Sequence, residues 1–330
     1  MRFAEPARDA ATPWAEIARP TRPSRLAGVT MAGFRGRGAD VVDYLAVPPP
    51  AVMLAVEFGD GRLVVEDATG RERHGSLAAG LAPGAARVRA RGGVGCVQVR
   101  LAPAAALAVL GVPLVELSHT VVTLEDLWGR DVAPIEEQLH QARSWEHRFG
   151  IIDAALARRR DAGPPVAAEV AVAWERIVTS SGRIRVDQLA GEVGWSRQRL
   201  WSRFHSQVGL TPKRAARLVR FDRAAHRLAA GASPARVAAE GGYADQSHLH
   251  REVRDFVEMT PTVVADQPWL AWTTSPGPTP RRLCRHWPRP CGRSGNILVI
   301  VASSPSGTRS ISSILSMIIF WKRCTGSSNR

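Results

Sequence analysis

Cysteine is scarce in this sequence, and long apolar runs are missing. The chain has 4 cysteines in 330 residues, and no two of them are spaced as Cys-x-x-Cys, which argues against a disulfide scaffold and a structural zinc site. The longest apolar stretch, 311–321, is interrupted by serines and is shorter than the roughly 20 residues that span a bilayer. The amino terminus lacks the apolar core of a signal peptide. We therefore expect a cytoplasmic protein with no membrane partner.

Acidic residues are absent from the last part of the chain. The formal net charge is +14, but residues 267–330 contribute nine basic and no acidic side chains to it, whereas residues 167–266 have 15 basic and 11 acidic ones. Net charge bears on steering and solubility rather than on fold, so it is weak evidence for a nucleic-acid partner here. We interpret residues 266–330 as a disordered or frame-shifted tail and residues 1–40 as a mobile extension.

Residues 41–162 combine short apolar runs with turn signals. Runs at 51–58, 62–65 and 94–101 predict strands, and Gly59-Asp60-Gly61 between the first two is typical of a β-hairpin. Helical patterns follow at 103–110, 121–128, 135–143 and 145–160. We predict a β-rich sensor or dimerisation domain with trailing helices over 41–162. Because Gly163-Pro164-Pro165 disfavours regular structure, we place a linker at 163–166.

The strongest signal is a repeat of about 48–49 residues within 167–265. Each copy predicts a short helix, a turn and a second helix. Gly194 and Gly242 stand at the turns, where glycine adopts a positive φ without strain. Ser196 and Asp245 follow them as N-caps of the second helices. Each copy ends in Thr-Pro, at 211–212 and 260–261.

One continuous helix is predicted between the copies, over 212–230, with proline at its start and Gly231 after its end. Its apolar stripe consists of Leu218, Phe221, Ala225 and Leu228. Its positive side chains, which either bind phosphate or are simply solvated, are Lys213, Arg214, Arg217 and Arg220. A stiff helix of this length would hold the two copies close to one turn of DNA apart.

The second helix of each copy has a polar outward face. Leu200 and Phe204 face the core in the first copy, as Leu249 and Val253 do in the second. The candidate DNA-binding residues on the outward faces are Arg197, Gln198, Trp201 and Ser202, and Gln246, Ser247, His250 and Arg251. Glutamine can pair with adenine, arginine with guanine, and small hydroxyls with several base edges. Any amphipathic helix has a solvated face, but two copies in register favour recognition of DNA.

These residues carry a resemblance to a known family. Residues 170–264 resemble the C-terminal DNA-binding domain of AraC/XylS-type transcription regulators. The resemblance rests on Leu189-Ala190, Gly194, Ser196, Leu200, Phe204, Gly209, Thr211-Pro212, Ala238, Gly242-Tyr243, Asp245-Gln246-Ser247-His248, Leu249, Phe256 and Met259-Thr260-Pro261. It implies seven helices, two recognition helices in adjacent major grooves of double-stranded DNA, and no catalytic chemistry.

Two departures from the family pattern lie near residue 260. Glu258 stands where the family has glycine, so we expect strain in that turn. Val263, Val264 and Ala265 replace an aromatic–arginine pair, so we expect a short or poorly capped last helix.

The region before the linker resembles the sensor domains of actinobacterial members of this family. The likeness lies in Gly92–Leu101, Leu110–Pro113 and Asp126–Asp131. It implies a module that senses a small-molecule effector or forms a homodimer. A regulator of this kind also has RNA polymerase as a potential partner.

Other candidate sites give no comparable pattern. His74, His119, His140 and His147 form no His-x-His or His–carboxylate cluster, so no metal or other cofactor is expected. Cys96 lies in a predicted strand and is interpreted as a small buried residue. Ser118-His119 lacks the positioned acid and the nucleophile context of a hydrolase triad.

The sequence thus predicts an α+β multidomain chain, with a β-rich sensor domain before an all-α domain of two helix-turn-helix subdomains joined by a linker helix. The predicted function is sequence-specific regulation of transcription, without enzymatic activity, in the cytoplasm and at the nucleoid when bound. Three alternatives stay open: a non-specific DNA-binding protein, a decayed family member with a damaged C-terminus, and an enzyme fused to a regulatory domain.

Overall fold

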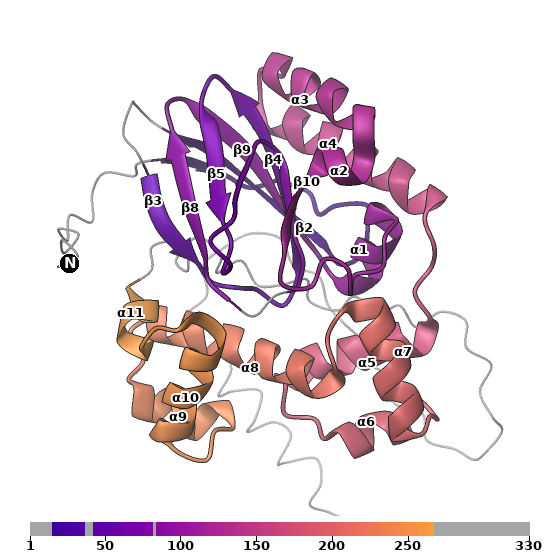
Figure 1. Cartoon of the computed structure of the whole chain (residues 1–330), viewed down its shortest axis with the longest axis vertical. Helices are drawn as coiled ribbons and strands as arrows, with labels where there is room; N and C mark the ends of the chain where they lie inside the picture. The colour runs from indigo at the N-terminus through magenta and orange to yellow at the C-terminus, as the bar shows by residue number, and fades with distance from the viewer. Residues whose placement is uncertain (1–14, 37–41, 82–83, 267–330) are drawn as a thin grey trace, which may run out of the picture. The chain divides into compact units, whose positions relative to one another are not determined.

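Strands fill the first part of the chain, and helices fill the rest (Figure 1). The structure is a computed structural model that describes residues 15–36, 42–81 and 84–266. The predicted α+β architecture, with β-structure first and helices last, is confirmed. The interpreted tail at 266–330 lies outside the described residues, apart from Asp266.

Two antiparallel sheets make up the strand region. The first has six strands, in the spatial order β1 (Ala15–Ala18), β2 (Val29–Gly36), β9 (Val94–Leu101), β4 (Val52–Gly59), β7 (Leu77–Ala79) and β10 (Val121–Thr123). The second has four, in the order β3 (Val42–Ala46), β8 (Ala86–Arg91), β5 (Arg62–Glu66) and β6 (Glu72–His74).

The two faces of the six-stranded sheet differ in burial. Alternate residues of β9 such as Val97 and Val99 are fully buried, whereas Gln98 and Arg100 between them are only half-buried. Helices cover the better buried face. The opposite face lies toward the second sheet, as the packing of Ala55 of β4 against the small core of that sheet shows. Side chains alternate across a strand, so these two environments follow from the sequence alternation.

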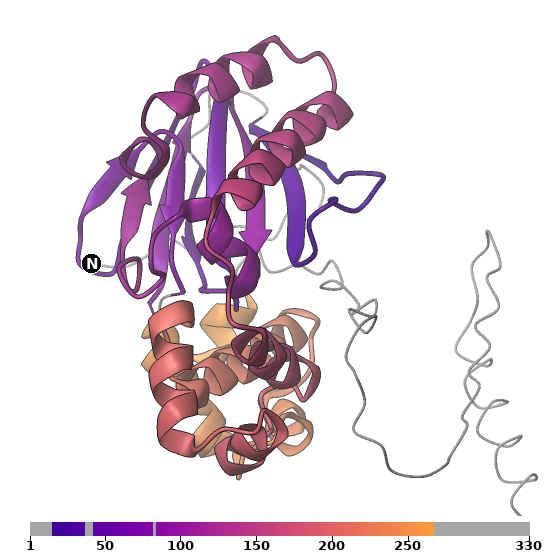
Figure 2. The same ribbon diagram turned by 90° about the vertical axis from the view of Figure 1, so that its right-hand side faces the viewer.

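Four helices accompany the first sheet: α1 (Pro103–Leu110), α2 (Leu124–Trp128), α3 (Val132–Gln141) and α4 (Trp145–Ala162). Figures 1 and 2 show α3 and α4 on one side of the sheet. Trp145 packs edge-on against Phe58 at 5.6 Å between ring centroids. Its indole nitrogen donates to Glu16 Oε1 over 2.7 Å. A side chain at Gly33 would collide with the Trp145 ring, so the glycine in β2 lets the helix approach closely.

The prediction of a mobile extension over residues 1–40 is wrong for residues 15–36. They include β1 and β2, which pair with each other, and β2 also pairs with β9. These strands escaped the sequence analysis because the segment is rich in Arg, Ala, Pro and Gly and lacks a sustained apolar alternation. Backbone pairing with the apolar strand β9 fixes them in place. Residues 1–14 and 37–40 lie outside the described residues.

The hairpin predicted at Gly59-Asp60-Gly61 is also wrong. The flanking strands β4 and β5 exist as predicted, but they belong to different sheets. The chain crosses between the sheets here, next to the turn that joins β8 to β9. A side chain at Gly61 would meet the backbone of Val94 and Arg91, so close approach to that turn is what requires glycine.

The helical pattern expected over 121–128 divides into a strand and a helix. Thr123 ends β10 and caps α2, because its hydroxyl accepts from the Asp126 amide while the Asp126 carboxylate accepts from the Thr123 amide. This capping box fixes the helix start at residue 124. A short 3-10 turn, Gly129–Asp131, leads into α3.

Seven helices follow the linker: α5 (Ala168–Thr179), α6 (Val186–Glu192), α7 (Arg197–Val208), α8 (Pro212–Ala229), α9 (Pro234–Gly241), α10 (Gln246–Val257) and α11 (Pro261–Ala265). Each helix from α7 onward begins at a Ser, Thr or Asp whose side chain accepts a backbone N–H, namely Ser196, Thr211, Ser233, Asp245 and Thr260. Such caps stabilise a helix by about 1 kcal/mol each. Neither α8 nor any other helix in the described ranges is long and apolar enough to cross a membrane.

Candidate nucleic-acid interface

Two helix-turn-helix units stand at the ends of the linker helix α8. In the first, α6 and α7 meet at Gly194, and in the second, α9 and α10 meet at Gly242. Both glycines have a positive φ, 69° and 80°, as the repeat predicts. α8 contacts helices of both units, and its apolar residues Leu218 and Phe221 are buried. The two units are therefore packed onto one continuous helix.

The predicted inward face of each second helix is confirmed. Leu200 and Phe204 of α7 are fully buried, as are Leu249 and Val253 of α10. Since the two residues of each pair lie four positions apart, they belong to one buried stripe, and the opposite side of each helix faces outward.

On α7, all four candidate residues are exposed, namely Arg197, Gln198, Trp201 and Ser202. Arg197 pairs with Asp187 of α6 at 3.0 Å, in a contact in which both side chains are largely exposed. Trp201 is 51% exposed, and its ring stacks on His205 with 5.2 Å between centroids. Arg199, which the sequence analysis did not select, lies over the ring of Trp195 at 4.8 Å.

On α10, three of the four candidates are exposed, and His250 is half-buried. His250 Nε2 lies 3.5 Å from Gln246 Nε2. The Arg251 guanidinium donates to the carbonyl of Ser247 over 3.4 Å, within its own helix. These contacts are weak and within one helix, so the four side chains can change partners when another molecule approaches.

A buried ion cluster that the sequence analysis missed joins α8 to α10. Glu252 is 1% exposed and accepts from Arg217 Nε at 2.9 Å and from Arg220 Nε at 2.9 Å. Arg217 also donates to Asp255 over 2.7 Å. Arg220 lies over the ring of Tyr243 at 4.9 Å, and burial followed by the Glu252 carboxylate raises the pKa of that tyrosine above its usual range.

Arg217 and Arg220 of α8 thus donate to the buried Glu252 carboxylate and are not available to phosphate groups. A sequence signal for the cluster existed, because Glu252 stands three residues after Leu249 and four before Phe256. That spacing places the carboxylate on the inward face of α10, where a charge requires a partner.

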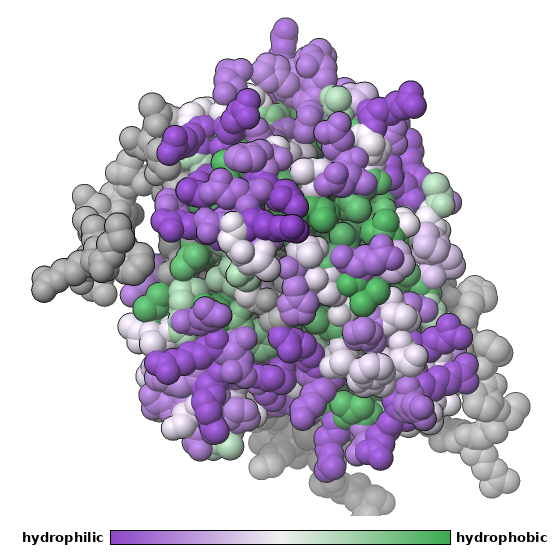
Figure 3. Space-filling model, viewed as in Figure 1, coloured by the Kyte–Doolittle hydropathy of each residue, from purple (hydrophilic) through white to green (hydrophobic). Residues whose placement is uncertain are grey.

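The surface over the second unit is mainly hydrophilic. Figure 3 shows mostly purple, hydrophilic side chains over α9 and α10. The exposed side chains there include Arg236, Arg251 and Arg254. Exposed arginines at these places can meet phosphate groups, which position a protein on DNA without specifying a sequence.

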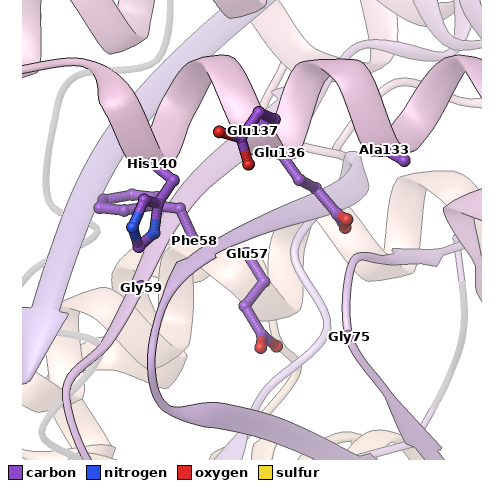
Figure 4. Close-up of a pocket in the computed structure, with 8 residues that line it drawn as sticks. All are labelled: Glu57, Phe58, Gly59, Gly75, Ala133, Glu136, Glu137 and His140. Carbon is purple, nitrogen blue, oxygen red and sulfur yellow. The ribbon is translucent and has the colours of Figure 1, made fainter.

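An acidic pocket lies apart from these helices, between the end of β4 and α3 (Figure 4). Its volume is about 360 Å³, and its charged or titratable lining residues are Glu57, Glu136, Glu137 and His140. Burial, together with the Glu136 carboxylate, raises the pKa of Glu57. Within the described part of the chain, no group of three or more His, Cys, Asp or Glu side chains is arranged to hold a metal ion.

The two remaining sequence candidates lie in structural contacts. Burial, with the nearby Glu57, raises the pKa of the Cys96 thiol to about 12, so the reactive thiolate is disfavoured at neutral pH. The Ser118 hydroxyl lies 3.0 Å from the carbonyl oxygen of Gly209, to which it donates.

Comparison with known proteins places the helical region in a family. Residues 189–267 match a family described as a helix-turn-helix domain. No curated protein matches the chain. Among solved structures, apo ToxT from Vibrio cholerae is 11% identical, with a TM-score of 0.41, and the match covers 74% of this chain and 98% of ToxT.

Two further solved structures are similar in part. The C-terminal domain of AraT, a response regulator from Geobacillus stearothermophilus, is 16% identical over 30% of this chain and 85% of its own, with a TM-score of 0.29. The AraC-like transcriptional activator CuxR is 17% identical over 67% of this chain and 89% of its own, with a TM-score of 0.21. The family match, the repeat and the two units on α8 agree that residues 189–267 form a helix-turn-helix domain.

Proposed function

We propose that the chain is a transcription regulator of the AraC type, and that it binds DNA sequence-specifically by reading two adjacent major-groove segments, one with α7 and one with α10. The observation that carries the proposal is the pair of units on α8, each with a buried apolar stripe and an exposed polar face on its second helix. The 18 residues of α8 span about 27 Å at 1.5 Å per residue. That length is compatible with successive major-groove segments about 34 Å apart.

The proposed readers differ in chemistry. Gln198 and Gln246 present amides that can pair with adenine, and Arg251 presents a guanidinium that suits guanine. Ser202 and Ser247 offer small hydroxyls that pair with several bases. Arg197 can leave Asp187 for DNA at little cost, because a surface ion pair contributes at most about 1 kcal/mol.

Selection from a random DNA pool at near-physiological salt tests the proposal. We expect enrichment of a bipartite motif with halves about 10 base pairs apart. Binding that depends steeply on salt but enriches no motif would favour a non-specific DNA-binding protein. A folded chain that retains no DNA binding would favour a decayed member of the family.

The strand region is proposed to sense a small-molecule effector. The face of β9 that looks toward the second sheet carries Gln98 and Arg100, whose polar groups can form hydrogen bonds with a ligand. The hydrogen bond from the Ser118 hydroxyl to the carbonyl of Gly209 connects the strand region to the end of α7. Binding of an effector would act on α7 through this contact. If the full chain and residues 160–266 bind the operator identically with every metabolite tried, this proposal fails.

Further partners and the location remain predictions. A homodimer and a contact with RNA polymerase are proposed from the resemblance alone. Binding to chromosomal DNA would place the chain in the cytoplasm, at the nucleoid when bound.

A further inference from the structure

Trp201 is a large apolar side chain on a helix face that is otherwise polar and exposed to solvent. Of the large apolar side chains that the structure describes, it is the most exposed, at 51%, and no other aromatic side chain among them is as open. An indole ring gains free energy when it leaves water, and the core of the first unit is complete without it, because Leu200 and Phe204 fill that face. The exposed ring therefore indicates an apolar contact outside the chain.

The ring is also held in a defined orientation. Trp201 and His205 are four residues apart on α7, and their rings are almost parallel, with an angle of 8° between the planes. His205 covers one side of the indole, so the other side and the outer edge stay open. Gln198 lies three residues before Trp201, so the ring belongs to the same outward face as this polar candidate.

The major groove offers one apolar group on its base edges, the 5-methyl group of thymine. We propose that Trp201 contacts the methyl group of a thymine in the half of the operator that α7 enters. This inference rests on the proposed function and adds a base identity to it. Exposed arginines on the same helix, Arg199 and Arg203, supply positive charge that suits the phosphates on either side of the groove.

The second unit lacks an equivalent apolar reader. The repeat shift of 49 residues that aligns Leu200 with Leu249 places His250 at the position of Trp201. His250 is half-buried and lies beside Gln246, so this position offers a polar ring. The two halves of the operator therefore differ chemically, and dependence on a thymine methyl group is confined to the half bound by α7.

Deoxyuridine provides the test, because it differs from thymidine only by the missing methyl group. The full chain is titrated with the selected operator and with versions in which each thymine is replaced singly by deoxyuridine. We expect affinity to fall about 4-fold at one thymine of one half, the effect of removing one methyl group from an apolar contact. Trp201→Ala should bind both versions equally, whereas Trp201→Phe should keep part of the difference.

His250→Ala is the matched control, and it should retain the full difference at that thymine. Thermal unfolding of each variant checks that the fold is intact. If Trp201→Ala still distinguishes thymine from deoxyuridine, or if no replacement matters, the inference is overturned while the bipartite motif stands. A change of oligomeric state in Trp201→Ala with no change at any thymine would overturn it in favour of a contact between copies. Absence of a motif would overturn both proposals.

Discussion

Single residues in the left-handed backbone region carry a stability cost that can be measured. Glu258, which ends α10, has a φ of 57°, and the expectation of strain at this residue is confirmed. A non-glycine residue in this region costs about 1–2 kcal/mol. Because glycine also makes the unfolded chain more flexible, Glu258→Gly should raise the free energy of unfolding by about 0.5–1 kcal/mol in urea titrations.

Gly194 supplies the reverse experiment. Its φ is 69°, and an added Cβ would meet no atom within 4 Å, so Gly194→Ala introduces backbone strain without a collision. The free energy of unfolding should fall by about 1 kcal/mol. A stabilised Gly194→Ala, or a destabilised Glu258→Gly, would contradict the backbone geometry of these two turns.

Glu57 should make stability depend on pH. Burial and the Glu136 carboxylate raise its pKa in the folded chain above the usual value of a glutamate side chain, 4.5. The folded state therefore holds this proton more tightly, and stability falls as the pH rises from the unfolded pKa through the folded one. Glu57→Gln should be more stable than the wild type at pH 8, with the advantage lost at pH 3, in urea titrations at both values. Glu116→Gln, at an exposed position, is the control and should show no such advantage.

At the scale of elements, Glu252 should decide how firmly α10 is held on α8. Glu252→Gln leaves Arg217 and Arg220 without their buried counter-charge, and removal of one partner of a buried pair costs about 3 kcal/mol or more. We expect that loss in the free energy of unfolding, together with weaker binding to the operator half read by α10. Footprinting of each half gives the second measurement, with the α7 half retained.

A matched exposed carboxylate separates this effect from simple loss of charge. Glu240 accepts from Arg236 and Arg227 on the surface of the same unit. Glu240→Gln should change the free energy of unfolding by less than about 1 kcal/mol. Equal effects of the two variants would mean that Glu252 does not act as a buried link.

The elements that the sequence predicted well are those fixed by local chemistry. A capping side chain marks the start of a helix in the sequence, as Ser196, Thr211 and Asp245 do here. The helices α7, α8 and α10 therefore begin where the sequence predicts. Two of the predictions that failed concern strands whose partners are distant in the sequence. Gly59-Asp60-Gly61 has the local form of a hairpin, but which strand β4 pairs with depends on β9, some 40 residues later. β1 and β2 are likewise held by β9 and α4 rather than by their own pattern.

The candidate DNA-binding residues could be located but not ranked from the sequence. Spacing alone placed Trp201 on the outward face, yet only the structure shows the ring stacked on His205. The sequence left open whether Arg217 and Arg220 bind phosphate or are solvated, and it did not reveal their acidic partner, which lies more than 30 residues away in α10. Which basic side chains remain available for DNA is therefore a property of packing.

At the scale of the whole molecule, α8 should make the spacing of the operator halves rigid. Both units pack against this one helix, so they cannot turn independently to follow a shifted half-site. Insertion of five base pairs moves one half to the opposite side of the duplex. Simultaneous binding is then lost, and affinity should fall by about 100-fold or more, toward that of a single half.

Titration of the full chain with operators carrying inserts of zero, one and five base pairs measures the effect at constant salt. Scrambling the five inserted bases should make no further difference, since only the spacing matters. Undiminished affinity with the five-base-pair insert would mean that one unit binds alone, and α7 and α10 would then not read one bipartite site together.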